Sequence, residues 1–80
     1  MKVLNRMINY GVALFPTTSA VMRAEKLLIK ASYKIKLIPT PREFSSDCGI
    51  ALRFEWDKYE DIASCLNFAN VEIESIHQMK

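Results

Sequence analysis

The chain has 80 residues, half of them apolar and a quarter charged, which is typical of one globular domain and not of a disordered segment. A domain of this size buries only about 60–65% of the surface that its unfolded chain exposes, so an elaborate active site is not expected. The 11 basic and 9 acidic residues give a net charge of +2 and are spread through the chain, which argues against nucleic acid as a partner.

Residues 1–9 are predicted to be a leader of unknown role in front of a single domain over residues 10–80. The leader runs into an apolar stretch that is short and ends at Pro16, so the sequence predicts neither a signal peptide nor a membrane span. Two cysteines in a chain with no predicted signal peptide indicate a reducing compartment, so the sequence predicts free thiols and a cytoplasmic location. The cysteines lack C-x-x-C spacing, and the chain has one histidine. The same residues predict no metal site and no cofactor.

Residues 10–15 are rich in strand formers and predict a first strand that stops at Pro16. A helix should follow and end near Ser32. Its candidate N-cap residues are Thr17, Thr18 and Ser19. The apolar positions that follow helical spacing, and should face the core, are Ala20, Ala24, Leu27, Leu28 and Ala31.

Met22 and Ile29 lie two turns apart on the opposite side of this predicted helix, between lysines. The simpler interpretation is that they are scattered surface apolar residues, which are common on soluble proteins. The alternative is a stripe that binds a partner. Residues 34–38 then alternate polar and apolar side chains, which predicts a second strand with Ile35 and Leu37 directed inward.

The run from Leu37 to Phe54 is the stretch with the character of a functional site. Pro39 and Pro41 restrict their own backbone and that of the preceding residues, so the loop should leave the sheet in a narrow set of directions. We expect this loop to present the thiol of Cys48. The residues predicted to form the setting of the thiol are Arg42, Ser45, Ser46 and Gly49.

A thiolate that takes up sulfur needs an exposed position near N–H dipoles or cations. Arg42 could favour the anion, the two serine hydroxyls could donate hydrogen bonds to it, and Gly49 can take a positive φ at little steric cost. Asp47 would favour the neutral thiol, so the balance stays open. The alternative is that Cys48 is a small, half-buried residue at the start of a strand.

The order of residues in this loop resembles a known signature. Pro39-Thr40-Pro41-Arg42 followed by Ser45-Ser46-Asp47-Cys48-Gly49 is similar to the signature of a family of small selenium/sulfur carrier-like proteins. The likeness extends from about Tyr10 to Ile76, and outside the loop it consists of hydrophobic pattern. The resemblance implies that Cys48 carries sulfur or selenium as a persulfide-type adduct.

Alternation resumes after Gly49 and predicts a third strand, with Ile50, Leu52 and Phe54 on one face. Asp57 could then cap a second helix. The predicted buried positions of this helix are Tyr59, Ile62, Ala63, Leu66 and Ala69. Cys65 lies beside that face and is interpreted as a small hydrophobic residue at the edge of the core.

Asn70 is a candidate left-handed end for the second helix, and residues 71–74 alternate as a fourth strand. His77 falls in the C-terminal segment after that strand, which is expected to fray, and it is assigned no role. The resulting order predicts an α+β, ferredoxin-like βαββαβ domain with two helices on one face of a four-stranded antiparallel sheet. The other face should be charged. Its predicted side chains are Lys34, Lys36, Arg53, Glu55, Glu72 and Glu74.

Two functions remain open at this point. The first is a sulfur or selenium carrier in which Cys48 accepts sulfur from a donor protein and passes it to an acceptor protein. The alternative is a non-catalytic interaction or dimerisation module in which the cysteine is structural, since sheet edges favour pairing between copies. RNA recognition is disfavoured because Arg53 and Glu55, not aromatic residues, should face outward. An independent enzyme is disfavoured because the chain shows no paired carboxylates, nucleophile–histidine pair or phosphate loop.

Overall fold

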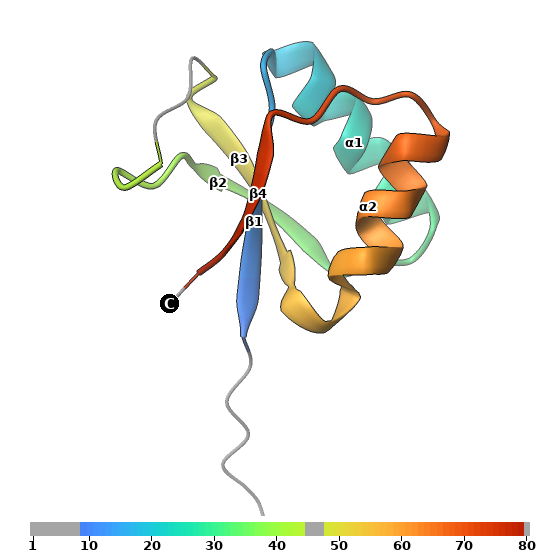
Figure 1. The fold of residues 1–80 in the computed structure, drawn as a ribbon. Helices are drawn as coiled ribbons and strands as arrows, with labels where there is room; N and C mark the ends of the chain where they lie inside the picture. Colours follow the sequence, from blue (N-terminus) through green and yellow to red (C-terminus); the bar gives the residue numbers. More distant parts are fainter. Residues whose placement is uncertain (1–8, 45–47, 80) are drawn as a thin grey trace, which may run out of the picture.

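A computed structural model describes residues 9–44 and 48–79. Its strands form one antiparallel sheet in the order β2-β3-β1-β4, and both helices cover the same side of the sheet (Figure 1). The elements in chain order are β1 (Tyr10–Leu14), α1 (Thr18–Lys30), β2 (Ile35–Pro39), β3 (Ile50–Glu55), the 3-10 helix η1 (Trp56–Lys58), α2 (Tyr59–Phe68) and β4 (Ser75–Gln78). This arrangement confirms the ferredoxin-like α+β fold.

Helix α1 begins as the sequence predicts. Thr17 is the N-cap, and its side chain accepts a hydrogen bond of 3.1 Å from the backbone N–H of Ala20. The helix ends at Ala31, and Ser32 turns the chain with a φ of 70°. The buried face is rotated from the predicted one, because Val21 is fully buried whereas Ala31 is exposed. The buried side chains of α1 are Val21, Ala24 and Leu28, and Ala20 and Leu27 pack against the core as predicted.

The main core lies between the helices and the sheet. It is built on Leu52 and Phe54 of β3, as their alternation predicts, together with the buried positions of both helices. Gly11 of β1 lies opposite Phe54, and a Cβ at Gly11 would approach side-chain atoms of Trp56 and Phe54 to 2.5 and 2.7 Å. The absence of a side chain at this position therefore lets the two aromatic rings pack over the middle of the sheet.

The opposite face of the sheet is not the charged surface that the sequence predicts. Val12, Leu14 and Ala51 form a second buried cluster there. The residues packed against this cluster are Ile38, Phe44 and Met79. Because β1 is a central strand, its run of apolar residues is buried on both faces and does not alternate.

Charged residues on this open face lie beside the second cluster. Arg53 is 4.2 Å from the centre of the Tyr10 ring, an arrangement that favours a cation–π contact. Arg53 and Lys36 face one another across the β2–β3 pair. Two residues predicted for this face, Glu72 and Glu74, lie in the connection before β4 and not in a strand.

Strand β4 lies four residues later than predicted. Residues 71–74 form the connection from α2, in which Val71 is buried in the main core and Ile73 packs against it. Asn70 has a φ of 59°, which confirms the predicted left-handed end of α2. Pairing with β1 starts where the backbone N–H of Glu74 donates to the carbonyl of Leu14, and it continues with Val12 opposite His77. His77 therefore belongs to the sheet and not to a frayed end.

Helix α2 also begins differently from the prediction. Asp57 lies inside η1 and does not cap α2, whose N-cap is Lys58 without a side-chain hydrogen bond. Ile62 and Leu66 are buried as predicted, but Tyr59 is 38% exposed. The Tyr59 ring instead stacks on Trp56 with ring centres 4.8 Å apart. Because η1 occupies residues 56–58, α2 begins only at Tyr59, and the Trp56–Tyr59 pair lies at the first turn of α2.

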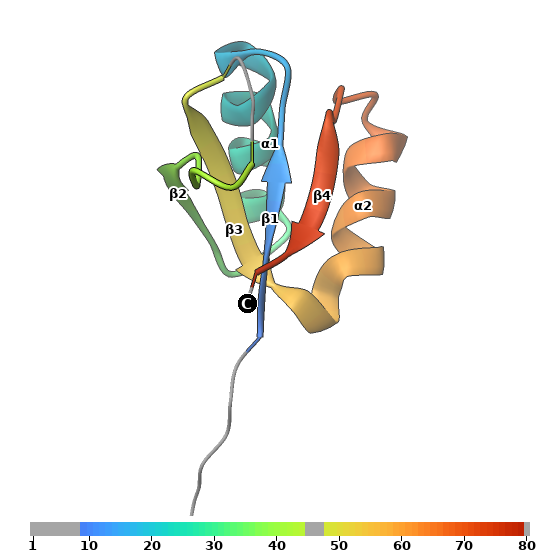
Figure 2. The ribbon, with the colours of Figure 1, turned by 60° about the vertical axis from the view of Figure 1, so that its left-hand side comes forward.

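The charges of the chain are divided between two halves, which corrects the prediction that they are spread through it. Residues 9–44 contain six basic and two acidic residues, and residues 48–79 contain two basic and six acidic residues. The first group includes α1 and the edge strand β2, and the second includes α2 and the opposite edge strand β4 (Figure 2). A nearly balanced net charge thus conceals a basic first half and an acidic second half of the chain.

Candidate functional site

Cys48 lies just before β3, at the end of the sheet where α1 begins. β1 and β3 are antiparallel neighbours, so the residues that follow β1 and those that precede β3 meet at one end of the sheet (Figure 1). Thr18, the first residue of α1, places its Oγ1 3.9 Å from the Sγ of Cys48. The thiol is therefore next to a helix N-terminus, where N–H dipoles favour a negative charge.

The backbone around the thiol is attached to the end of β2. Thr40, the residue after β2, donates two hydrogen bonds to the segment before β3. Its backbone N–H donates to the carbonyl of Gly49 at 3.0 Å, and its hydroxyl donates to the carbonyl of Cys48 at 2.8 Å. Pro41 to Phe44 then form a turn closed by the N–H of Phe44 and the carbonyl of Pro41. The prolines thus lead into an ordered turn, and Thr40 fixes the position of the cysteine backbone.

The thiol itself is buried, contrary to the expectation that the loop presents it to solvent. Cys48 is only 4% exposed and belongs to the main hydrophobic core. Cys65 is partly buried at the edge of that core, as predicted, and both cysteines are free thiols. The reason is the direction of the side chain: Cys48 faces the helices, two residues before Ile50 on the helix side of β3.

The residues predicted to surround Cys48 are described only in part, and those described are exposed. Arg42 lies exposed in the Pro41–Phe44 turn. Gly49 is exposed and does not have a positive φ, so that part of the prediction is wrong; a Cβ at Gly49 would meet no atom within 4 Å. Ser45, Ser46 and Asp47 lie outside the described residues.

The sequence did not predict the contacts that Thr18 and Thr40 make with Cys48. Thr18 was considered only as a helix cap, and Thr40 only as part of the proline turn. Thr18 could have been found from topology, because an antiparallel β1–β3 pair brings the start of the helix to the residue before β3. Thr40 shows no signal of its own in the sequence, since its role depends on the register in which Pro39 faces Ile50.

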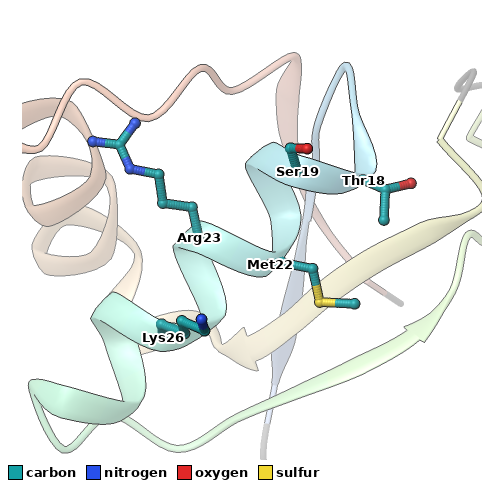
Figure 3. Close-up of a pocket in the computed structure, with 5 residues that line it drawn as sticks. All are labelled: Thr18, Ser19, Met22, Arg23 and Lys26. Atoms are coloured by element: carbon teal, nitrogen blue, oxygen red, sulfur yellow. The ribbon is translucent and has the colours of Figure 1, made fainter.

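A shallow hollow lies on α1 beside Thr18. It is lined by Thr18, Ser19, Met22, Arg23 and Lys26. Figure 3 shows that Arg23 extends away from Thr18 and Met22, in the direction of α2. A guanidinium nitrogen of Arg23 donates to the carbonyl of Ala69, just after α2, at 3.1 Å. The hollow thus lies on the exposed α1 surface next to Thr18, the residue that contacts the Cys48 sulfur.

A second polar contact lies on the open face of the sheet. The ring of His77 stacks on Phe44 with ring centres 4.4 Å apart, and its Nε2 lies 3.0 Å from the hydroxyl of Ser75. This stack attaches the turn after β2 to β4.

Among residues 9–44 and 48–79, no three His, Cys, Asp or Glu side chains come close enough together to hold a metal ion. No helix within these ranges is long and apolar enough to cross a membrane.

Comparison with known proteins gives one result. A family model described as "Putative Se/S carrier protein-like" matches residues 10–78. No curated protein and no solved structure gives a significant match to the chain. The matched range contains all the strands and helices described above, and both the proline turn and Cys48. The chain therefore belongs to the Se/S carrier-like family.

Proposed function

We propose that the chain is a sulfur or selenium carrier in which Cys48 accepts the atom from a donor protein and passes it to an acceptor protein. The observation that supports this proposal best is the position of the Cys48 sulfur, 3.9 Å from the hydroxyl of the first residue of α1. A helix N-terminus stabilises the anionic thiolate that such chemistry needs. The family match supports sulfur or selenium as the atom that is carried.

The transfer is an exchange between sulfur atoms with no net oxidation. The Cys48 thiolate attacks the outer sulfur of a persulfide on the donor, a new S–S bond forms at Cys48, and the donor cysteine leaves as a thiolate. In the second step a nucleophile of the acceptor attacks the outer sulfur, and Cys48 leaves as a thiolate. Each step breaks one bond to the transferred sulfur and forms one, so no external oxidant or reductant is required. We place this exchange in the cytoplasm, where thiols stay reduced.

Because Cys48 is 4% exposed, the proposal requires a local opening during transfer. The groups that hold the cysteine backbone in the closed state are the two hydrogen bonds from Thr40. One of these hydrogen bonds is between backbone groups and the other is from the Thr40 hydroxyl. Each is worth about 1 kcal/mol, which local fluctuations can supply. In this proposal the protein protects its loaded sulfur from water and releases it only to a docked partner.

The burial of Cys48 also supports a second candidate function. A cysteine in the main core packs as a small hydrophobic residue, and the protein would then be a ferredoxin-like interaction or dimerisation module. Its edge strands β2 and β4 would offer the surface for pairing with another chain. In this case Cys48 takes no part in chemistry.

Sulfur uptake separates the two candidates. The parent protein is treated with glutathione persulfide, and peptide mass spectrometry then locates any added sulfur on Cys48 or Cys65. The carrier proposal expects the adduct on Cys48, unchanged uptake in Cys65→Ser, and none on the remaining cysteine of Cys48→Ala. Absence of the adduct from Cys48 in the folded parent rejects the carrier and supports the interaction module. The parent measurement holds even if Cys48→Ala is destabilised, because it requires no variant.

A further inference from the structure

The outer side of α1 carries a row of exposed side chains that begins at the candidate thiol. We call this row the α1 stripe; its residues are Thr18, Met22, Lys26 and Ile29. They are spaced by three or four positions, so they lie on one side of the helix, whereas its opposite side packs into the core. Met22 is 40% and Ile29 is 58% exposed. The row runs from Thr18 to Ile29 and is therefore about 17 Å long.

Two lysines lie beside the apolar members of the stripe. Lys26 and Lys30 are exposed on α1, whereas Arg23 extends toward α2, and the one carboxylate of the helix, Glu25, is partly buried. The carboxylates of the described chain lie mainly in residues 48–79, at the end of β3, in η1 and α2, and in the connection before β4. A surface that complements the stripe would therefore have an apolar centre surrounded by carboxylates.

We propose that the α1 stripe docks the protein that exchanges sulfur with Cys48, and that this partner presents an acidic surface with an apolar centre. The proposal rests on the carrier function proposed above. Thr18 belongs to the stripe and contacts the Cys48 sulfur, so a partner seated on Met22 and Ile29 would bring its own cysteine to the thiol end of α1. The hollow between Thr18 and Lys26 offers a seat for one apolar side chain of the partner (Figure 3).

Other anionic partners fit the stripe less well. Binding of single-stranded nucleic acid uses cations along a groove together with aromatic residues on which bases stack, and α1 contains no aromatic residue. A helix that lies on a membrane needs a broad apolar face, whereas the apolar face of α1 is already packed in the core. An exposed row with two apolar side chains between cations matches a protein surface best.

Binding can be measured without sulfur chemistry. The ¹⁵N-labelled full chain is titrated with a synthetic amphipathic helical peptide that has leucines on one face, glutamates around them and serine in place of cysteine. A peptide with lysines in place of the glutamates is the control. We expect the acidic peptide to shift the backbone amide signals of the α1 stripe, and raising the salt concentration to about 0.5 M to weaken its binding roughly tenfold. Equal shifts with the lysine peptide, or shifts confined to other elements, would overturn the proposal.

Matched charge reversals locate the binding face. Lys26→Glu/Lys30→Glu changes two exposed lysines of α1, and Lys34→Glu/Lys36→Glu changes two exposed lysines at β2 by the same net charge. We expect the α1 variant to bind the acidic peptide at least about tenfold more weakly and the β2 variant to stay within about threefold of the parent. Equal weakening by both variants would show attraction to net charge alone and would overturn the proposal.

Two further measurements complete the test. A single-stranded oligonucleotide and anionic phospholipid vesicles are titrated in the same way, and tighter binding of either one to the α1 stripe than of the acidic peptide would overturn the protein partner. Loading of Cys48 by glutathione persulfide is then measured in the parent protein, because this small donor needs no docking. Loading without peptide binding rejects the docking face alone, and peptide binding without loading rejects the carrier chemistry alone.

Discussion

The side chain of Cys48 has two kinds of neighbour. It belongs to the hydrophobic core, and it lies beside Thr18 at the start of α1. Because a buried thiolate loses its hydration, each hydrogen bond to the sulfur has a large effect on its reactivity. Thr18 therefore provides a test of the proposed chemistry that leaves the cysteine itself in place.

We predict that Thr18→Val slows the reaction of Cys48 with iodoacetamide about threefold to tenfold, since removing one hydrogen bond costs about 0.5–1.5 kcal/mol. Valine keeps the shape of the side chain but has no hydroxyl. Thr18→Ser keeps the hydroxyl and should react at a rate close to that of the parent. The rates are measured by mass spectrometry of the Cys48 peptide, with Cys65 as the internal control. A Thr18→Val rate equal to that of the parent would remove Thr18 from the site.

The two glycines of the chain make a second matched pair. A Cβ at Gly11 would approach Trp56 to 2.5 Å, whereas a Cβ at Gly49 would meet nothing within 4 Å. We predict that Gly11→Ala lowers the free energy of unfolding by about 1–3 kcal/mol, because the two aromatic rings over β1 must move. Gly49→Ala should change it by less than about 0.5 kcal/mol. Urea denaturation measures both values, and a similar loss in the two variants would contradict this account of the packing.

Single residues also show where sequence reasoning reaches its limit. The proline turn and Cys48 could be identified from the sequence, but the surroundings of the thiol were assigned to residues close in sequence, such as Arg42 and Gly49. The contact observed joins Cys48 to Thr18, 30 positions away. Such a contact depends on which strands are neighbours, and residue types within the loop carry no information about it.

At the scale of elements, the start of α1 follows directly from local chemistry. Thr17 has extended backbone angles and accepts a hydrogen bond from Ala20, which satisfies one N–H of the first turn. This cap positions the helix N-terminus that we propose to act on Cys48. Its effect on the fold can be separated from its effect on the thiol.

We predict that Thr17→Ala lowers the free energy of unfolding by about 0.5–2 kcal/mol, and that Thr17→Asp, which restores an acceptor, recovers most of the loss. Thermal unfolding followed by circular dichroism measures the change. Ser19→Ala is the control, because Ser19 is exposed in the same turn without acting as the cap. Equal losses from Thr17→Ala and Ser19→Ala would show that the cap contributes nothing specific.

The order of the elements could be predicted from sequence, but their boundaries in the second half could not. Residues 71–74 alternate as a strand does, yet Val71 and Ile73 use that alternation to pack against the core while the chain crosses from α2 to the sheet. Residues 75–78 alternate less clearly and become β4 because β1 offers them an unpaired edge. Pairing with an available edge thus outweighs local pattern at this end of the chain.

At the scale of the whole molecule, the sheet has a buried cluster on both sides. The helices cover one side (Figure 1). The segment after β2 covers part of the other through Phe44, which packs on the second cluster and stacks on His77. A domain of 80 residues has a small core, so this second cluster adds to a narrow margin of stability. It also ties the turn that follows β2 to the strand at the far edge.

The division of charge belongs to the same scale. The total composition shows only a small net charge, and the sequence positions of the charges gain meaning once α1 and β2 are known to share one side of the molecule. A count of charged residues in each half of the chain would have shown the asymmetry. It would not have shown that α1 carries basic residues on an exposed face next to a thiol. The docking surface therefore depends on topology and sequence together.

Phe44 and Phe68 provide the test of the second cluster. Phe44 is partly buried against it, whereas Phe68 is 91% exposed at the end of α2. We predict that Phe44→Ala lowers the free energy of unfolding by about 1–2 kcal/mol, less than the roughly 3–5 kcal/mol of a fully buried phenylalanine, and that Phe68→Ala changes it by less than about 0.5 kcal/mol. Urea denaturation of the three proteins gives the comparison.

The same pair of variants shows whether the second cluster affects the thiol. Phe44 holds the turn from which Thr40 reaches Cys48, so we expect Phe44→Ala to increase the rate of Cys48 alkylation as well as to reduce stability. Phe68→Ala should leave that rate unchanged. If Phe44→Ala lowers stability but does not change the alkylation rate, the two faces of the sheet act independently, and the opening that exposes Cys48 does not pass through the stack of Phe44 on His77.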